Sequence, residues 1–512
     1  MDIDLINNNI KYAKAALTTL VTQEETMEMI VPDALPDILH IVDTDATVML
    51  RGKEAEAGRV SISGIVSATV IYSPEGVPGV KKLDVNMPFN VVVSGGEITG
   101  SSKVAAVLSL SSIDSSMLNS RKINVHANIL ADVTCYNESE LVIATGVDTD
   151  VDPCMETLCN TTEISTVSAI REKTFVVSDE FSIPAALPGL DEILKISVDF
   201  SIEDASAVGN KLIFRGECRV SLIYLPIGES GICTTEFKSE FSQIVELDEV
   251  SEEDIVDIKL MLTGQYFDLS MQDMENRTLV SELHLVAQCT IMSRFVAEYL
   301  ADTYSTKYEL SQETARESIE HRCGTFKVSD TLRDTIDIPA NVKDVVSVNV
   351  HCGPAAAEIA GDTLNLNAMV LVSILYITEN DQVLSVSCRR EITASSECNG
   401  SHNYAASAAA GKDIYAAAAG SSIDLRVLVE FTVSETDIVE FTYIQSLSYD
   451  EDKVIDLSSR PSLVIHIAES TDTLWSLAKR FSSSTSLIYA ANDLAEGDTI
   501  STGQQLIIPK RR

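Results

Sequence analysis

The sequence predicts a mainly β chain with some α. We expect three tandem β-rich units of the antiparallel-sheet or sandwich type, followed by a small strand–helix–helix–strand (βααβ) domain. Two sequence landmarks recur three times in the same register, which indicates a tandem triplication. Alternating apolar and polar residues with Gly/Pro turns fill each unit and are typical of antiparallel strands. From about residue 461 the periodicity becomes helical.

The first landmark is a proline loop and the second is a strand that ends in tyrosine. The loops read IVPDALPDIL (30–39), SIPAALPGLDEIL (182–194) and DIPANVKDVV (337–346), and the strands read VSATVIYSPEG (66–76), CRVSLIYLPIG (218–228) and MVLVSILYITEN (369–380). Tyr72, Tyr224 and Tyr376 follow one another at intervals of 152 residues (224 − 72 and 376 − 224). We expect each tyrosine to pack at a strand end beside its turn, and a ligand contact is the alternative.

The landmarks divide the chain into five segments. We expect a first β-rich repeat with an N-terminal helix over 1–155, a second repeat over 156–312, a third over 313–450, a linker over 451–460 and the C-terminal domain over 461–512. The stretch LINNNIKYAKAALTTLV (5–21) is the clearest candidate for the N-terminal helix. A similar helical segment is expected before the second repeat.

The charge of the chain is one-sided. Asp and Glu number 77 against 37 Lys and Arg, which gives a net charge of −40. Residues 461–512 are neutral, with five acids (Glu469, Asp472, Asp493, Glu496, Asp498) and five bases (Lys479, Arg480, Lys510, Arg511, Arg512), so the rest carries the whole excess. Such a surface repels phosphate backbones and anionic lipids, which argues against nucleic acid and membrane partners. No apolar run is long enough to span a bilayer, and acids stand where a signal peptide carries bases.

The sequence contains no recognisable active site. The seven histidines are scattered, and the sequence has no metal-binding, phosphate-binding or nucleophile motif. His321–Cys323 and His351–Cys352 are close in sequence, but neither pair recurs in the other repeats. The ten cysteines lack CxxC spacing, and we expect reduced, mostly buried thiols. We therefore predict a protein that is not an enzyme and needs no cofactor or metal.

The C-terminal segment carries a specific motif. LVIHIAES reads as a strand, STDTLWSLAKRF as a helix with Asp472 as its N-cap, STSLIYAAN as a second helix that Asn492 ends in a left-handed conformation, and TGQQLIIP as a second strand. This pattern resembles the LysM domain. The residues that match it are Asp472, Thr473, Leu474, Trp475, Leu477, Ala478, Phe481, Leu487, Asn492, Gly503, Gln504, Leu506, Ile508 and Pro509.

Three positions depart from the LysM pattern. Thr471 and Ser482 stand where glycine is usual, and His466 replaces a tyrosine. The resemblance places a glycan groove beside Asp472–Thr473 and the stretch after Asn492, and a side chain at Thr471 puts sugar binding in doubt. The partner- or glycan-binding surface that we predict consists of Thr471, Asp472, Thr473, Trp475, Lys479, Asn492, Asp493 and Leu494. Trp475, the only tryptophan, is either a core residue or an exposed interface anchor.

The complete arrangement resembles the SipL-like spore coat assembly proteins, which carry repeated SPOCS domains and a C-terminal LysM domain. This resemblance implies a non-enzymatic coat scaffold in the mother-cell cytoplasm, at the forespore surface. It also implies that the LysM domain binds the coat ATPase, stage IV sporulation protein A, and that other coat proteins are partners. The alternatives are a peptidoglycan (N-acetylglucosamine) binding protein of the cortex or wall and, less favoured, a cell-wall enzyme.

Overall fold

The structure is a computed structural model that describes residues 1–512 except 149–153, 229–230, 248–250, 252, 271–272, 274, 457–460, 496 and 511–512. Almost all described elements are strands, and each repeat contains six of them. The first repeat contains β1 (Leu5–Ile30), β2 (Ile38–Glu56), β3 (Arg59–Pro74), β4 (Lys81–Ser94), β5 (Lys103–Asn119) and β6 (Lys122–Val147). The second contains β7 (Met155–Ser182), β8 (Leu190–Val208), β9 (Lys211–Pro226), β10 (Cys233–Glu246), β11 (Ile255–Leu269) and β12 (Thr278–Ser305).

The third repeat and the C-terminal domain complete the chain. The third repeat contains β13 (Tyr308–Asp337), β14 (Val342–Ala360), β15 (Thr363–Thr378), β16 (Val383–Glu397), β17 (Asn403–Ala418) and β18 (Ser422–Val454). The C-terminal domain contains β19 (Leu463–Ile467), α1 (Leu474–Phe481), α2 (Thr485–Ala491) and β20 (Gln505–Pro509). The expected division at 312/313 falls inside β13, and β18 extends into the expected linker, of which residues 457–460 lie outside the described residues.

Every repeat has the same topology. The second, third and fourth strands form one antiparallel sheet, and the first, sixth and fifth strands form the other, in that spatial order. A single residue pair, Ala13 with Val167, joins the outer sheets of the first two repeats into a six-stranded sheet. Apolar side chains from the inner faces fill each sandwich, as the alternation of buried and exposed residues along β3, β9 and β15 requires. The predicted β-rich sandwich repeats and the C-terminal domain are confirmed.

The predicted N-terminal helix is wrong, because residues 5–30 form the strand β1. This strand pairs with β6 from Leu5 opposite Val147 to Ile30 opposite Lys122. The segment before the second repeat is likewise a strand, β7, paired with β12. The Lys/Ala run favours a helix locally, but the four Thr residues and Val21 that follow it suit a strand. Pairing along the whole segment decides the outcome.

The three repeats pack around a common centre with approximate threefold symmetry. In each second strand a bulge turns one residue toward this centre, and these residues are Val42, Leu194 and Val346. They lie in one apolar cluster with the residues that precede the repeated tyrosines, Ile71, Ile223 and Leu375. All six occupy the same positions counted from the starts of their strands. The three repeats therefore pack against one another like the subunits of a trimer and do not form a linear row of separate domains.

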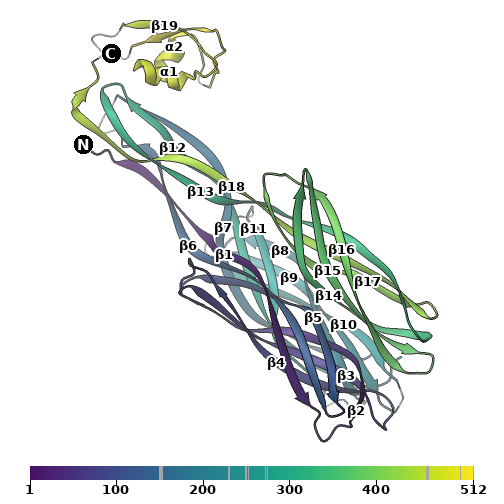
Figure 1. Cartoon of the computed structure of the whole chain (residues 1–512). Coiled ribbons are helices and arrows are strands. Elements are labelled where there is room, and N and C mark those ends of the chain that lie inside the picture. The colour runs from purple at the N-terminus through teal and green to yellow at the C-terminus, as the bar shows by residue number, and fades with distance from the viewer. Residues whose placement is uncertain are drawn as a thin grey trace.

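The long first and sixth strands of the repeats continue beyond the sandwiches as a stalk (Figure 1). Equivalent residues of the three sixth strands meet inside it: Leu141, Ala297 and Phe441 share one cluster, and Ala144, Leu300 and Ile444 share the next. At the far end the N-terminal segment joins the third repeat, where the Ile3 amide donates to the Leu447 carbonyl at 2.9 Å. The C-terminal domain sits at this end of the stalk (Figure 1).

Candidate functional site

The C-terminal domain is a two-stranded sheet covered on one face by two short helices. β19 and β20 pair antiparallel from Leu463 opposite Pro509 to Ile467 opposite Gln505. The buried residues of its core are Ala468, Leu474, Leu477, Ala478, Ile488, Leu506 and Ile508. In α1, Leu474, Leu477 and Ala478 pack inward, as their helical spacing requires. In α2 only Ile488 is buried, and the prediction that Leu487 also faces inward is wrong, because this side chain is 36% exposed. The predicted strand–helix–helix–strand order is confirmed.

The loop before α1 uses Asp472 and Thr473 for its own structure. The N-cap is Thr473, whose hydroxyl accepts from the Ser476 amide at 3.0 Å while the Ser476 hydroxyl accepts from the Thr473 amide at 2.9 Å. Asp472, the expected cap, instead accepts from the Glu469 amide at 2.9 Å and from His466 Nε2 at 2.7 Å. These two donors, the amide first, lower the pKa of Asp472. The shorter Thr473 side chain reaches the helix amide, and Asp472 closes the loop.

Asn492 is also a structural residue. Its amide nitrogen donates to the carbonyls of Ile488 at 2.8 Å and Ile507 at 2.7 Å, and its oxygen accepts from the Ile507 amide at 2.7 Å. The side chain thus fastens the end of α2 to β20. Asn492 has a φ of −118°, so the expected left-handed stop does not fall on it; Asp493, with a φ of 54°, adopts that conformation.

The remaining positions near the expected glycan groove differ in exposure. Thr471 and Asp493 are exposed, whereas Leu494 is half-buried against the domain core. The backbone of Thr471 does not enter the positive-φ region, so this loop does not need the glycine that is usual there. Ser482, the other replaced glycine, has a φ of 53° and lies in the left-handed region. Of the two replaced glycines, only the one at Ser482 therefore carries a conformational cost.

Trp475 and Lys479 face the second repeat. The indole Nε1 donates to Asp302 Oδ2 at 2.8 Å. The Lys479 ammonium lies 2.6 Å from Asp302 Oδ1 and 2.8 Å from Oδ2. Because α1 places positions four apart on one face, the two side chains approach the same carboxylate together. Trp475 is therefore neither purely a core residue nor a free surface residue, since it lies in a contact within the chain.

Tyr304 completes this contact. Its ring packs edge-on against Trp475 with the ring centroids 5.0 Å apart, and its hydroxyl donates to the Ser483 carbonyl at 2.9 Å. Tyr304 is 6% exposed and belongs to the apolar core of the C-terminal domain. Asp302 and Tyr304 lie near the end of β12, far from α1 in sequence. No sequence signal pointed to them, because their role depends on how the second repeat and the C-terminal domain meet.

The Asp302 carboxylate is held in its ionised form. Partial burial on its own raises the pKa of this carboxyl, but the hydrogen bonds from Lys479 and Trp475 outweigh it and lower the pKa. The Lys479 side chain is 40% exposed and that of Asp302 is 24% exposed, so solvent screens the pair partly. Such a pair contributes modestly to stability and can open without a large cost.

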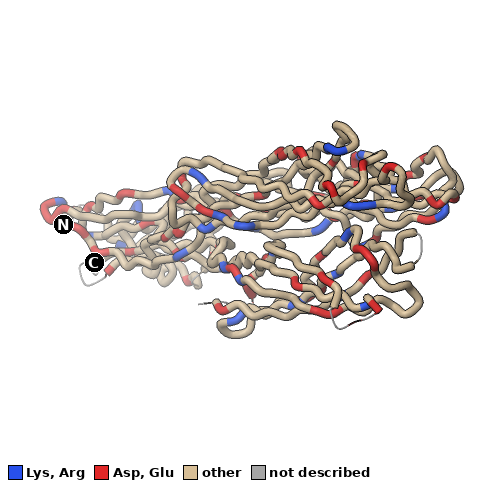
Figure 2. Tube along the Cα trace, turned by 90° about the horizontal axis from the view of Figure 1, so that it is seen from below, with Lys and Arg blue, Asp and Glu red and all other residues tan. Residues whose placement is uncertain are grey.

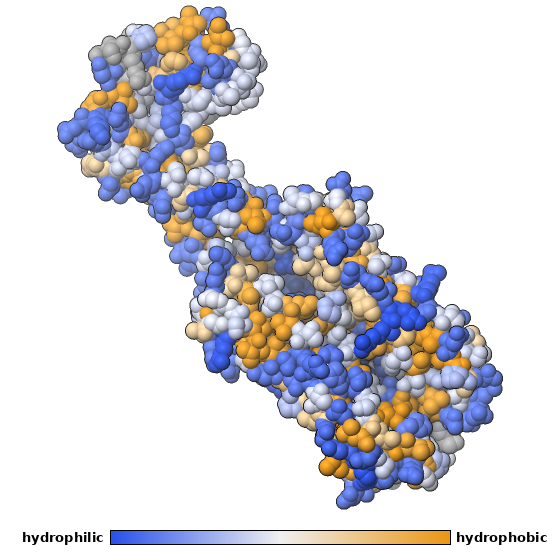
Figure 3. Space-filling view, in the orientation of Figure 1, coloured by the Kyte–Doolittle hydropathy of each residue, from blue (hydrophilic) through white to orange (hydrophobic). Residues whose placement is uncertain are grey.

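The outer face of the β19–β20 sheet is apolar. Leu463, Ile465 and Ile467 are 50%, 59% and 65% exposed. Figure 3 shows hydrophobic residues gathered at the outer end of this domain. Side chains of this kind offer no hydrogen bonds to a sugar and favour contact with another protein surface.

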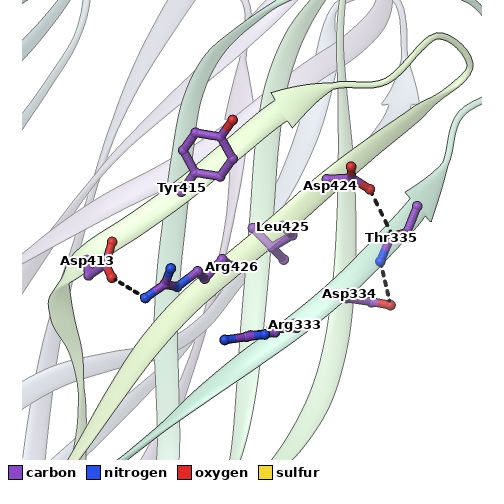
Figure 4. A pocket seen from close by; sticks show the side chains of 8 residues that line it. All are labelled: Arg333, Asp334, Thr335, Asp413, Tyr415, Asp424, Leu425 and Arg426. Carbon is purple, nitrogen blue, oxygen red and sulfur yellow. Dashed lines mark hydrogen bonds and ion pairs between the residues drawn. The ribbon is translucent and has the colours of Figure 1, made fainter.

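A hollow on the third repeat is the other concave feature (Figure 4). Its lining comes from β13, β17 and β18 and consists of Arg333, Asp334, Thr335, Asp413, Tyr415, Asp424, Leu425 and Arg426. Arg426 pairs with Asp413 at 2.9 Å, and the Thr335 hydroxyl donates to Asp424 at 2.9 Å. The Arg426 and Asp413 side chains of the hollow, and the Thr335 and Asp424 side chains, are thus paired with each other.

Four further properties of the described residues concern metal ligands, disulfides, membrane-spanning helices and the distribution of charge. No group of three or more His, Cys, Asp or Glu side chains among the described residues could hold a metal ion. All ten cysteines are free thiols. No helix in the described part of the chain is long and apolar enough to cross a membrane. Acidic residues are spread along the whole trace rather than gathered in one segment (Figure 2).

Comparison with known proteins gives two family matches. The model described as "SipL, SPOCS domain" matches residues 37–118 and 190–269, and the LysM domain model matches residues 466–509. The two SPOCS segments cover β2–β5 and β8–β11, the same four strands of the first and second repeats. No curated protein and no solved structure gave a match. The chain thus carries two SPOCS-domain segments and a C-terminal LysM domain and is similar to SipL, which supports a sporulation-coat-related protein.

Proposed function

We propose that this chain is a non-enzymatic adaptor of the spore coat. In this proposal it works in the mother-cell cytoplasm, at the forespore surface, where its LysM domain binds the coat ATPase, stage IV sporulation protein A. The three repeats contact other coat proteins and hold the LysM domain at a distance from them. The observation that carries the proposal is the LysM domain at the end of a stalk that all three repeats build together.

The surface of the LysM domain supports a protein partner. Asp472, Thr473 and Asn492 are committed to the domain's own hydrogen bonds. Exposed apolar side chains cover the outer sheet face, and the domain carries the only tryptophan of the chain. Tryptophan and large aliphatic residues are common anchors of protein interfaces.

Binding of purified full-length chain to purified stage IV sporulation protein A tests the proposal. A chain that ends at Arg460 and keeps the circular dichroism of the repeats is the matched control. We expect the full chain to bind and the shortened chain to lose most of its affinity. Equal binding by both chains would contradict a role for the LysM domain.

Peptidoglycan is the second candidate ligand, because Thr471 and Asp493 remain exposed beside the expected glycan groove. Co-sedimentation of the full chain with insoluble peptidoglycan tests this alternative. Retention of the chain in the pellet, together with no binding to the ATPase, would favour the glycan. An unretained chain that binds the ATPase would favour the adaptor.

A further inference from the structure

The contact between β12 and the LysM domain is specific to one repeat. Asp302 lies 24 residues after the first residue of β12, and the equivalent residues of β6 and β18 are Gly146 and Ser446. Tyr304 likewise corresponds to Asp148 and Ser448. Only the second repeat therefore combines a carboxylate with an aromatic ring at this place.

The contact with the second repeat does not follow from the position of the LysM domain in the chain. The LysM domain follows β18 of the third repeat, but its Trp475–Lys479 face contacts the second repeat. The domain therefore makes a non-local contact that depends on side-chain chemistry. An indole N–H and an ammonium meet one carboxylate, and a second aromatic ring covers the indole.

We propose that the segment Asp302–Thr303–Tyr304 is an internal substitute for the partner of the LysM domain. This inference rests on the proposed function, because it concerns the surface through which the LysM domain binds a protein. The partner presents an acidic residue and an aromatic residue two positions apart on an extended segment. The carboxylate lies between Trp475 Nε1 and Lys479 Nζ, and the aromatic ring packs on the indole.

The internal segment then acts as a latch. A partner that uses the Trp475–Lys479 face must displace Asp302 and Tyr304, so the free chain binds more weakly than a chain whose latch is open. The apparent affinity is the intrinsic affinity multiplied by the fraction of molecules in which the face is free. The latch can open because its ion pair is partly exposed to solvent.

Trp475 provides a direct readout, because it is the only tryptophan in the chain. The test uses the full-length Asp302→Ser/Tyr304→Ser variant, which places the residues of the third repeat at the same strand positions. Glu298→Ser, an exposed acid on the same strand, is the control. We expect the double variant to show red-shifted Trp475 emission and stronger quenching by acrylamide, whereas the control is unchanged. Unchanged emission in the double variant would overturn the latch.

The same variants are then titrated with stage IV sporulation protein A. Opening the latch is expected to strengthen binding roughly tenfold, as for a binding-competent state populated at about one-tenth. Equal or weaker binding by the opened variant would overturn the inference while leaving the adaptor intact. If no variant binds the ATPase, the proposed function fails instead.

A peptide in trans tests the recognition chemistry without the ATPase. A synthetic peptide of residues 297–307 is added to the double variant, with a second peptide carrying Ser at both 302 and 304 as control. We expect the native peptide to reverse the red shift of Trp475 and the control peptide to have no effect. If neither peptide, or both, changed the emission, the proposed acidic–aromatic recognition would be wrong.

Discussion

At the scale of single residues, a buried ion cluster holds the three repeats together at their centre. Lys195 of the second repeat lies 2.8 Å from Asp45 and 3.5 Å from Asp43 of the first. His351 of the third repeat lies 3.2 Å from Asp45. The side chains of Lys195 and Asp43 are each 3% exposed. One lysine thus faces two carboxylates that are largely withdrawn from water.

Replacing Lys195 tests this role. Lys195→Met leaves two buried carboxylates without their main partner, which typically costs about 3–5 kcal/mol. We expect a loss of stability of this size in urea-induced unfolding. Lys211→Met, at an exposed lysine of the same repeat, is the control and is expected to change stability by less than about 0.5 kcal/mol. Similar small effects of both substitutions would show that the cluster does not hold the repeats.

The same cluster predicts a dependence of stability on pH. Burial on its own raises the pKa of Asp45, but Lys195 and His351 outweigh it and hold that pKa well below its ordinary 3.8. The attraction of Asp45 and Asp43 outweighs burial at Lys195 and raises its pKa above 10.5. Because the pKa of Asp45 is lowered, its carboxylate stabilises the fold at every pH above the ordinary pKa of 3.8. This stabilisation is lost as the pH falls through the lowered pKa. Because the pKa of Lys195 is raised, its ammonium stabilises the fold at every pH below 10.5, and this stabilisation is lost as the pH rises through the raised pKa.

Thermal unfolding between pH 2 and pH 9 measures this dependence. We expect the melting temperature of the native chain to be nearly constant from about pH 5 to pH 9 and to fall below about pH 4. Lys195→Met is expected to melt lower near neutral pH and to flatten this acid decline, because its buried carboxylates gain by becoming neutral. A parallel decline in both proteins would place the acid sensitivity elsewhere.

At the scale of elements, the repeated tyrosine explains the repeated proline loop. The Tyr72 hydroxyl donates to the Pro36 carbonyl at 3.2 Å, and Tyr224 donates to Pro188 at 2.9 Å. Both tyrosines are fully buried, which confirms the expected packing at a strand end. An arginine that immediately precedes the sixth strand donates to each loop, Arg121 to the Leu35 carbonyl and Arg277 to the Leu187 carbonyl, both at 2.8 Å. In the first two repeats, the two sequence landmarks, the proline loop and the strand that ends in tyrosine, are therefore joined by hydrogen bonds.

The third repeat offers an internal comparison. Its loop lacks the second proline, and the Tyr376 hydroxyl donates no hydrogen bond within the described residues. We expect Tyr224→Phe to cost about 1 kcal/mol of stability and Tyr376→Phe almost nothing, as judged by urea-induced unfolding. Equal losses would mean that the ring, rather than the hydroxyl, carries the contribution of these residues.

The strands were predictable because their alternation reports which face is buried. The residues of β3, β4 and β9 show this most clearly. The strand β1 was not predictable, since its Lys/Ala run favours a helix and only its pairing with β6 fixes a strand. The left-handed residue after α2 was misplaced by one position, at Asn492 instead of Asp493, because either residue type tolerates that conformation.

At the scale of the whole molecule, the triplication becomes a trimer within one chain. The 152-residue spacing of the tyrosines predicted three similar units, but not that Val42, Leu194 and Val346 would meet. The LysM motif likewise predicted a surface containing Trp475 and Lys479, but not the Asp302 and Tyr304 that cover it. Contacts between units depend on surface chemistry at long sequence separation, for which one sequence carries no periodic signal.

Affinity capture from sporulating cells tests the central claim, that this chain is a coat adaptor acting through its LysM domain. The full-length chain, its Asp302→Ser/Tyr304→Ser variant and a chain ending at Arg460 serve as baits, and the captured stage IV sporulation protein A is quantified. We predict capture by the full chain, greater capture by the variant and loss of capture by the shortened chain. Equal capture of the ATPase by all three baits, or by none, would contradict the account.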